Sequence, residues 1–455
     1  MLAFALLVGW LVWLNIFKRD ELNNNIYNTK QDSSTERIIR GSIVTGDGTV
    51  LAVTNVDADG NETRSYPYGS LYAHVIGYAS NGRSGLEAEA NYDLLTSHSS
   101  LLSQLKASED SEKIRGDTVV VTLDPKLQQA AYNALGTYRG AVVVMEPDTG
   151  KIRAMVSKPD FNPNTISEEW ESMVSDETGS ALLNRATQGL YPPGSTFKIL
   201  TALAYIRQNE STWKNFSWNC TGSLTQSDVT ITCYNGEMHG TEDLAAAFAH
   251  SCNTAFASIG TGLDIGEFRD LAEDFLFNTS LPTTLQHSES RFSLEEGDSV
   301  GEQMTTSIGQ GDTLVTPLHM ALITSAVANG GILMRPYYVE RIETYDGDTV
   351  SERSPSICKT LMTPDEAEAL TTFMEGTVSY GTAAAISGNG YTAAGKTGSA
   401  EYESNGQTGT HSWFVGFTDV EDPDLVVAVI AEDGGTGSST AVPIAKAIFD
   451  TYYYG

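Results

Sequence analysis

Ser195 and Lys198 have the types and the spacing of a nucleophile and its base. Residues 192–194 (PPG) precede the serine, and an apolar, helix-like run follows the lysine. Prolines fix φ and glycine permits a tight turn, so Ser195 is predicted at a helix start, where backbone N–H groups favour developing negative charge. Lys198 follows one turn later on the same face. A desolvated lysine can lose its proton and act as a base.

Taken alone, this pattern is weak, because a serine three residues before a lysine is a common surface coincidence. The same spacing occurs at Ser103/Lys106, Ser211/Lys214 and Ser356/Lys359. The copy at Ser195 differs in its Pro-Pro-Gly lead and its apolar sequel.

Ser251-Cys252-Asn253 follows a helical run and is a second candidate. Serine and asparagine often cap helix ends, so the competing interpretation is a structural cap.

The third candidate contains the chain's single Lys-Thr-Gly, Lys396 to Gly398, which precedes a predicted strand hairpin. A lysine there can hold an anionic group and a glycine lets substrate approach the backbone. The competing interpretation is a turn with an exposed lysine.

The three motifs become specific in combination. Ser-x-x-Lys, Ser-x-Asn and Lys-Thr-Gly, in this order at Ser195, Ser251 and Lys396, form the set that defines penicillin-binding proteins and class A β-lactamases. Three independent coincidences in this order are improbable, so the functional interpretation is favoured.

The chain resembles class B penicillin-binding proteins, nearest to the short penicillin-binding protein A type, and the likeness covers nearly everything after the apolar N-terminal segment, residues 1–17. The residues that carry it, besides the three motifs, are Arg40-Gly41, Asp47-Gly48-Thr49-Val50-Leu51-Ala52, Gly85-Leu86-Glu87, Asp124-Pro125, Leu127-Gln128, Asn184-Arg185-Ala186, His239-Gly240, Gly309-Gln310-Gly311 and Thr316-Pro317.

The resemblance implies a D,D-transpeptidase that cross-links peptidoglycan through a serine acyl-enzyme. Ser195 would attack the penultimate D-Ala carbonyl of a pentapeptide stem and release the terminal D-Ala. Lys198 would take the serine proton, and Ser251 would relay a proton toward the leaving amine. The backbone N–H groups of Ser195 and Ser399 would form the oxyanion hole.

Substrate binding is assigned by the same resemblance. Asn253 would hold the substrate amide, Lys396 and Thr397 would bind its terminal carboxylate, and Gly398 would leave room on a strand edge. β-Lactam antibiotics would acylate the same serine, and no metal or cofactor is needed. A SEDS-family glycosyltransferase is the partner that the family implies.

Two other function classes use the same fold. A D,D-carboxypeptidase or β-lactamase would pass the acyl group to water, but no deacylating base can be identified in this sequence, and the long N-terminal region suits a synthase better. A β-lactam sensor on this fold usually also needs a transmembrane signalling domain. A non-catalytic scaffold would be free to lose the motifs, and all three are present.

Composition bounds the remaining possibilities. The 455 residues favour two or more folded units, and 58 acidic against 27 basic residues give a formal charge of −31, which makes nucleic acid an improbable partner. Cys220 and Cys233 lie near each other in a polar, loop-like stretch. The sequence is compatible with one disulfide between them and equally with two free thiols. No CxxC pair or histidine cluster indicates a metal site.

The N-terminal segment predicts location. Residues 2–17 are apolar apart from Gly9 and Asn15, slightly short for a membrane span, with Lys18 and Arg19 after them. We expect a single-pass anchor over residues 1–17 in a bacterial cell membrane, with the catalytic part outside. A membrane-proximal domain and linker over residues 18–115 and a transpeptidase domain over residues 116–455 would follow.

The hydrophobic pattern and the turn residues predict the helices and strands that must position the motifs. We expect a hairpin around residues 46–48, a helix over residues 85–105, a helix from Asp124 to about Leu135, and strands over 141–146, 151–157, 412–417 and 425–432. A final helix is expected over 441–453, and helices dominate residues 195–380. Strands at both ends with helices between them predict an α/β (α+β) fold with non-local strand pairing, a mainly antiparallel sheet in the transpeptidase part.

Overall fold

The computed structural model describes residues 4, 6–10, 13, 37–100, 113–176, 179–404 and 407–455. Its contacts divide the chain into two units. The N-terminal unit comprises Met1–Thr122, Asp160–Glu177 and Val339–Ser354, and the C-terminal unit comprises Leu123–Pro159, Thr178–Tyr338 and Pro355–Gly455. Most of the expected anchor and the stretches 14–36 and 101–112 lie outside the described residues. Within the described ranges, no helix is both long enough and apolar enough to cross a membrane.

The N-terminal unit contains a six-stranded sheet in the order β15-β14-β6-β2-β3-β4. Its strands are β2 (Ile43–Thr45), β3 (Val50–Val56), β4 (Glu62–Ser65), β6 (Thr118–Val121), β14 (Val339–Glu343) and β15 (Thr349–Glu352). The hairpin predicted around residues 46–48 joins β2 to β3, with Gly48 at φ +86°. Three stretches of the domain expected over residues 116–455 belong to this unit, namely residues 116–122, 160–177 and 339–354. The last of them contributes β14, which pairs with β6, and β15, which pairs with β14.

Short helices accompany this sheet: α3 (Ala73–Ile76), α4 (Gly85–Glu89), α5 (Asn91–Leu94) and α8 (Ile166–Ser175). The single helix predicted over residues 85–105 is wrong for residues 85–100, since α4 and α5 are separate and α5 ends at Leu94; residues 101–105 lie outside the described residues. The backbone leaves the helix there because Thr96 O accepts the N–H of Asp117, and the Asp117 carboxylate accepts the N–H of His98.

A buried ionic group, the Glu87 cluster, lies in this unit. The Glu87 carboxylate is fully buried, and its two oxygens accept from Arg40 Nε at 2.6 Å and Arg64 Nε at 2.7 Å. Tyr66 donates its hydroxyl to the same carboxylate at 3.2 Å. The Arg40 guanidinium also donates to Asn91 Oδ1, so the cluster links β4, α4, α5 and the segment before β2. Two residues noted for the family likeness, Arg40 and Glu87, are therefore paired.

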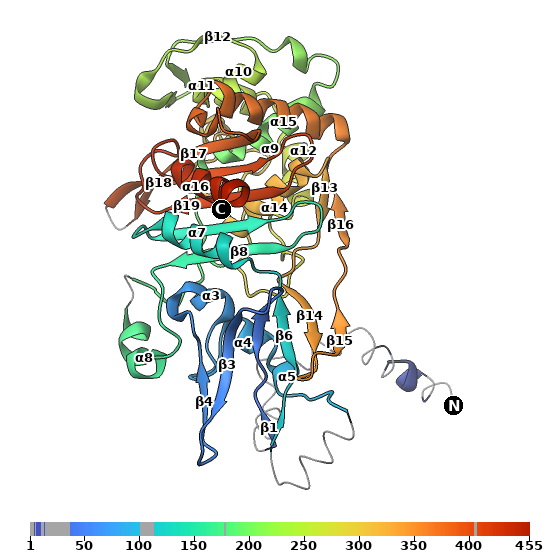
Figure 1. The fold of residues 1–455 in the computed structure, drawn as a ribbon. Helices are drawn as coiled ribbons and strands as arrows, with labels where there is room; N and C mark the ends of the chain where they lie inside the picture. The colour runs from blue at the N-terminus through green and yellow to red at the C-terminus, as the bar shows by residue number, and fades with distance from the viewer. Residues whose placement is uncertain are drawn as a thin grey trace. The chain divides into compact units, whose positions relative to one another are not determined.

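The C-terminal unit is built on a five-stranded antiparallel sheet in the order β17-β18-β19-β7-β8. Its strands are β7 (Gly140–Met145), β8 (Ile152–Lys158), β17 (Ala393–Ser404), β18 (Gln407–Thr418) and β19 (Leu425–Ala431). All of the strands predicted for this sheet are confirmed, and β19 from the C-terminal part pairs with β7. Figure 1 shows the red strands of the chain's end beside the cyan strands β7 and β8.

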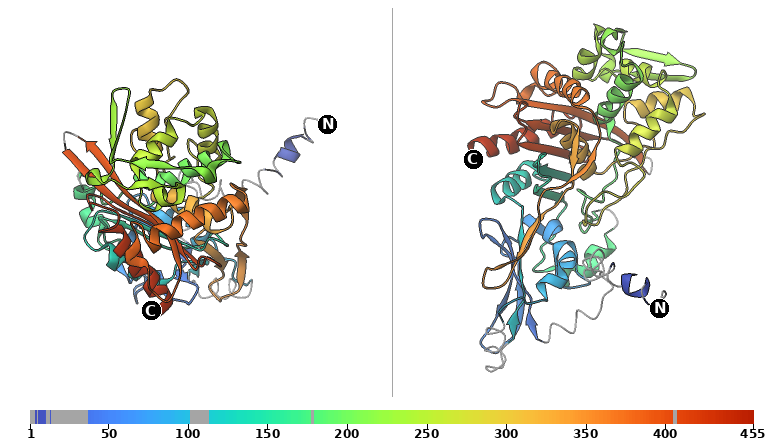
Figure 2. Two further views of the ribbon diagram at one scale, coloured as in Figure 1. Left: turned by 90° about the horizontal axis from the view of Figure 1, so that it is seen from above. Right: turned by 90° about the vertical axis from the view of Figure 1, so that its right-hand side faces the viewer.

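Helices cover both faces of this sheet. Two helices, α7 (Pro125–Leu135) and α16 (Ala441–Tyr454), pack on one face of the sheet against Val142, Val144, Val427 and Val429. All twelve residues of α14 (Pro317–Ala328) are buried, and this helix contacts β7, β18 and β19. Both predicted helices are confirmed, and the Asp124 carboxylate accepts two N–H groups at the start of α7. Figure 2 gives two further views of this layering.

Residues 195–380 consist mainly of helices joined by loops, as predicted. They contain α9 (Lys198–Gln208), α10 (Leu244–Ala249), α11 (Asn253–Gly260), α12 (Ile265–Asp274), α13 (Val300–Ser307) and α15 (Pro364–Ser379). Short strand pairs interrupt them: β9 (Trp218–Cys220) with β12 (Gly240–Glu242), and β10 (Ser223–Gln226) with β11 (Val229–Thr232). Thus the sheet comes from the two ends of the unit and carries Lys396 to Gly398 on β17, and the largely helical part between supplies Ser195, Lys198, Ser251 and Asn253.

Candidate active site

Ser195 lies in a 3-10 turn, η3 (Gly194–Phe197), which runs directly into α9. Gly194 opens the turn at φ +54°, a value that favours glycine. Thr196 donates its hydroxyl to Pro193 O at 2.7 Å and is fully buried, whereas Ser195 is half-buried. The Pro-Pro-Gly lead therefore fixes a turn that leaves the serine partly accessible at a helix start, as predicted.

Ser251 occupies a tight turn between α10 and α11. Its φ of +59° is left-handed, and the N–H of the next residue, Cys252, donates to Ala247 O at 2.8 Å. Cys252 is the N-cap of α11, and no side-chain cap bond forms there. The capping interpretation is therefore wrong, and the strained backbone aims Ser251 and Asn253 inward.

Lys396, Thr397 and Gly398 lie within β17, the edge strand of the sheet, and not in a turn before it. Lys396 is fully buried, so the exposed-turn interpretation is also wrong. The Thr397 hydroxyl bonds to the hydroxyl of Thr382. A Cβ on Gly398 would lie 3.1 Å from Pro193 O and 3.2 Å from Thr196 Cγ2, so this glycine lets the Ser195 turn pack against the strand.

Two buried lysines converge on the Ser251 side chain. Lys396 Nζ donates to Ser251 Oγ at 2.8 Å, and Lys198 Nζ lies 3.3 Å from the same oxygen. Lys198 Nζ also donates to Asn253 Oδ1 and to Ser251 O, both at 2.8 Å. Asn253 Nδ2 in turn donates to Thr232 O at 2.9 Å. The structure thus brings all three motifs together, although they are far apart in the sequence.

The environment of the two lysines lowers the pKa of both amines. Burial lowers the pKa of Lys198 to about 8. Burial, and next the charge of Lys198, lower the pKa of Lys396 well below its usual range. Two ammonium groups in one desolvated site repel each other, so one of the amines gives up its proton readily. Ser251 lies between them and can pass a proton from one nitrogen to the other.

The other Ser-x-x-Lys pairs that the structure describes have no such setting. Lys359 forms an exposed ion pair with Asp274 at 2.7 Å, and Lys214 lies over the Trp213 ring on the surface. Ser103 and Lys106 fall outside the described residues. The pair at Ser195 differs from these coincidences because Lys198 is buried and contacts Ser251 together with the buried Lys396. The sequence pattern does not report this burial.

Three residues that support the site were not singled out as site residues from the sequence. Thr382 holds Thr397, as described above, and no local motif marks it. Gly309 O accepts the N–H of Gly194 at 2.8 Å, so it holds the turn that carries Ser195. Tyr191 donates its hydroxyl to Glu432 at 2.8 Å just before this turn. Gly309 had been noted only for the family likeness, and Glu432 only as the end of a strand.

Trp413 is fully buried on β18 and donates its indole N–H to Pro192 O at 3.0 Å. Its position is a core position, and its N–H also fixes the backbone that leads into the Ser195 turn. We therefore regard Trp413 as support for the site.

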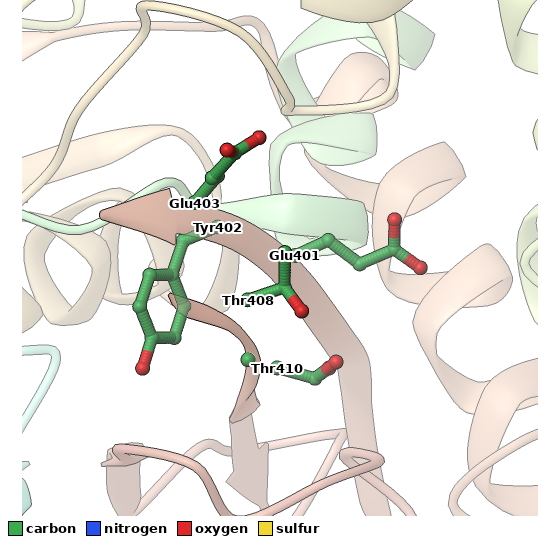
Figure 3. Close-up of a pocket in the computed structure, with 6 residues that line it drawn as sticks. Glu401, Tyr402, Glu403, Thr408 and Thr410 are labelled. Carbon is green, nitrogen blue, oxygen red and sulfur yellow. The ribbon is translucent and has the colours of Figure 1, made fainter. Parts of the chain in front are cut away.

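A hollow of about 540 Å³ lies on the β17–β18 hairpin beyond Ser399. Its lining residues are Glu401, Tyr402, Glu403, Thr408, Gly409 and Thr410. Figure 3 shows Glu401 and Tyr402 projecting to opposite sides of the strand. Neither Ser195 nor the two buried lysines line it. The hollow therefore belongs to the far part of the hairpin and not to the lysine network.

The fold and site define a class of protein. The transpeptidase domain of penicillin-binding proteins matches residues 140–450, and the chain belongs to that family. The dimerisation domain of penicillin-binding protein A matches residues 40–119. In sequence the chain is similar to the peptidoglycan D,D-transpeptidase PbpA of Mycolicibacterium smegmatis, with 34% identity over 98% of this chain and 96% of that protein.

Solved structures of penicillin-binding proteins are also similar to this chain. Penicillin-binding protein A from M. tuberculosis, as a ceftriaxone acyl-enzyme complex, has a TM-score of 0.84 and 31% identity over 92% of this chain and 99% of that one. The D,D-transpeptidase domain of a peptidoglycan glycosyltransferase from Eggerthella lenta has a TM-score of 0.82 and 33% identity, over 91% of this chain and 98% of that one. The predicted likeness to penicillin-binding protein A is confirmed, and so is the α+β transpeptidase fold.

A pH dependence follows from Lys198. Acylation of Ser195 by a fluorescent penicillin should rise about tenfold between roughly pH 7 and pH 9 and then level off, because a base with a pKa near 8 is neutral only above it. A lysine with an ordinary pKa would give a rate that keeps rising past pH 9.

In an unfolded chain Lys198 holds its proton to higher pH, so its contribution to folding stability also increases with pH between about 8 and 10.5.

Gly309→Ala should slow acylation by about ten- to a hundredfold, because small displacements of a nucleophile are costly. A Cβ on Gly309 would lie 1.9 Å from Gly194 O, so the Ser195 turn must move. The matched control is Gly311→Ala. Gly311 has a similar φ, +81° against +76°, but the nearest atom to its added Cβ is Thr305 Oγ1 at 3.6 Å. Equal acylation rates in the two variants would contradict the role of Gly309.

Proposed function

We propose that this chain is a peptidoglycan D,D-transpeptidase that cross-links stem peptides through an acyl-enzyme on Ser195. The observation that carries the proposal is the convergence of two buried lysines, Lys198 and Lys396, on Ser251. It supports proton transfer from a serine nucleophile to a lysine amine without a histidine. The names of the relatives and the acyl-enzyme complexes of penicillin-binding protein A support the same chemistry.

Acylation would begin at the penultimate D-Ala carbonyl of a pentapeptide stem. As Ser195 Oγ forms a bond to that carbon, Lys198 takes the hydroxyl proton. The bond to the terminal D-Ala nitrogen then breaks, and the leaving amine receives a proton through Ser251. The N–H groups of Ser195 and Ser399 would stabilise the oxyanion, which is the largest single contribution in acyl transfer of this kind.

Donor binding would use the remaining motif residues. Asn253 would bind the stem's amide, and Lys396 with Thr397 would bind its terminal carboxylate, beside the strand edge that Gly398 keeps clear. The acyl group is then transferred to an amine of a neighbouring stem, which forms the cross-link and frees Ser195. A β-lactam would enter as a mimic of the donor and acylate the same oxygen.

We also propose that the protein acts on the outer side of a bacterial cell membrane, held by the apolar segment 2–17, with a SEDS-family glycosyltransferase supplying glycan strands. The apolar composition of that segment supports the first part. The family resemblance supports the second. Co-purification of the full chain from detergent-solubilised membranes with such a polymerase would test both.

The test of the reaction uses the full chain, a fluorescent penicillin, and a pentapeptide donor with a D-amino acid acceptor. We expect covalent label that persists for hours and a product in which the acceptor replaces the terminal D-Ala. Ser195→Ala, which removes a single oxygen, is the control and should show neither. Label that disappears within minutes, with hydrolysed penicillin and tetrapeptide as the products, would instead establish a hydrolase.

A further inference from the structure

The side chain of Gln310 pairs with the free edge of β17 as the peptide group of a neighbouring strand would. Its carboxamide nitrogen donates to Glu401 O at 3.0 Å, and its oxygen accepts the Glu401 N–H at 3.2 Å. The opposite orientation of the amide would set oxygen against oxygen and N–H against N–H, so these two hydrogen bonds fix the orientation. One side chain thus satisfies both backbone groups of Glu401.

The backbone groups of an edge strand point alternately to its neighbour and to the free edge. On β17, Glu401 turns its N–H and C=O toward Gln310, and hence away from β18. Ser399 and Thr397, two and four positions earlier, therefore present theirs to the same free edge. Two contacts agree with this direction: Ser399 O lies 3.5 Å from the Gln310 carboxamide, and Lys396 Nζ donates to Thr397 O at 3.2 Å.

The proposed donor contacts set the direction of a bound stem peptide. A terminal carboxylate at Lys396 and Thr397, with the penultimate carbonyl at the Ser399 N–H, places the stem antiparallel to β17. The penultimate residue of the donor then faces Ser399. The residue two positions before it would face Glu401, the next residue of β17 with its backbone groups at this edge. The Gln310 carboxamide already occupies that position.

We propose that Gln310 ends the part of the β17 edge that a donor peptide can use, an inference that rests on the proposed acylation of Ser195. The donor then pairs with β17 through its penultimate residue alone, and the chain before that residue leaves the edge at Gln310. Peptides that add to a strand edge gain affinity from main-chain hydrogen bonds. Gln310 withholds the next pair of these bonds, so it makes the site selective for the end of the donor and indifferent to the backbone before it.

The backbone of Gln310 is held independently of its side chain. Its N–H donates to Thr305 O at 2.9 Å, and the N–H of Gly309 donates to Thr306 O at 2.9 Å, so both close the end of α13. Gln310 is half-buried and Glu401 is exposed. Replacement of Gln310 by alanine therefore removes the carboxamide, keeps these backbone bonds, and leaves the Glu401 N–H and C=O open to water or to a peptide.

Penicillins with peptide side chains test this inference, because their acylamino N–H would lie where the N–H of the penultimate D-Ala lies. One probe is 6-aminopenicillanic acid with an acetyl group, and the other carries N-acetyl-L-alanyl-L-alanine in its place. Only the second probe brings a further N–H and C=O opposite Glu401. The measurement is the ratio of their second-order rate constants for acylation of Ser195 in the full chain, obtained by competition with a fluorescent penicillin.

We expect the extended and the acetyl probe to react with the wild type at rates within about threefold of each other. In Gln310→Ala the ratio of extended to acetyl probe should rise about tenfold, because two backbone hydrogen bonds become available. Gln303→Ala is the matched control. Gln303 lies on the same helix, and its side chain also donates to a backbone carbonyl, Asp298 O at 3.0 Å, at the other end of α13. This control should keep the wild-type ratio.

Three outcomes would overturn the inference: a ratio of tenfold or more in the wild type, a ratio in Gln310→Ala equal to that of the wild type, or an equal rise in Gln303→Ala. Equal loss of rate with both probes belongs to the second outcome and is the result that a purely structural role of Gln310 would give. If circular dichroism shows that the alanine variant is misfolded, Gln310→Ser gives the same test. Absence of label on Ser195 from both probes would contradict the proposed function itself.

Discussion

Lys198→Met is expected to slow acylation of Ser195 by a fluorescent penicillin by about 10³- to 10⁴-fold, the upper range for removal of a general base. Methionine is unbranched and apolar and suits a fully buried position, so the α9 core should tolerate it. The variant keeps the nucleophile, the Ser251 turn and Lys396, but no group then accepts the proton of Ser195. The measurement is the second-order rate constant for covalent labelling.

Lys359→Met is the matched control, because Ser356 and Lys359 share the serine–lysine spacing but Lys359 forms an exposed ion pair with Asp274. Its labelling rate should equal that of the wild type. Circular dichroism of both variants checks that they are folded. A Lys198→Met rate within about tenfold of the wild type would show that another base, with Lys396 as the first candidate, takes the proton.

Glu87→Gln should destabilise the N-terminal unit by about 3–5 kcal/mol, because removal of one partner from a buried ion pair leaves charge without compensation. Here two guanidinium groups lose one shared carboxylate. Burial alone would raise the pKa of Glu87, but the guanidinium groups of Arg64 and Arg40 lower it below the ordinary value. The carboxylate therefore contributes stability above the ordinary glutamate range, and this contribution is lost as the pH falls through the lowered value.

Glu62→Gln is the control in the same unit, since Glu62 pairs with Lys113 at the surface and exposed pairs contribute about 1 kcal/mol or less. Hydrogen exchange of peptides from residues 37–100 in the intact chain reports the opening free energy of this unit by itself. Equal effects of the two substitutions would contradict the role of the Glu87 cluster. In acid the wild type and Glu87→Gln should converge.

The residues that meet at the site could be identified from the sequence, because the three motifs are local patterns with fixed internal spacing. Ser195 and Lys198 are one helical turn apart in any helix, and Lys396 to Gly398 fit a strand edge. The strands β7, β8, β18 and β19 were also predicted, since buried strands of Val, Ile and Ala stand out between polar turns. Their pairing across the unit followed from the position of strands at both ends.

Other features depend on contacts between distant segments and leave no local pattern. The left-handed backbone of Ser251, the support of Thr397 by Thr382, and the packing of Gly309 against Gly194 depend on tertiary structure. Likewise β14 looked like part of the second domain until its pairing with β6 placed it in the first.

The pairing of β7 with β19 also sets the order in which the protein can be made. Gly140 on β7 pairs with Ala431 on β19, so the central strand pair of the sheet joins the two ends of the unit. During synthesis, the β7–β8 hairpin therefore leaves the ribosome long before its partner and must wait with an apolar edge exposed. Such distant contacts also make folding slow. A chain that stops before residue 425 should keep the serine and both lysines but never assemble the sheet that holds them in place.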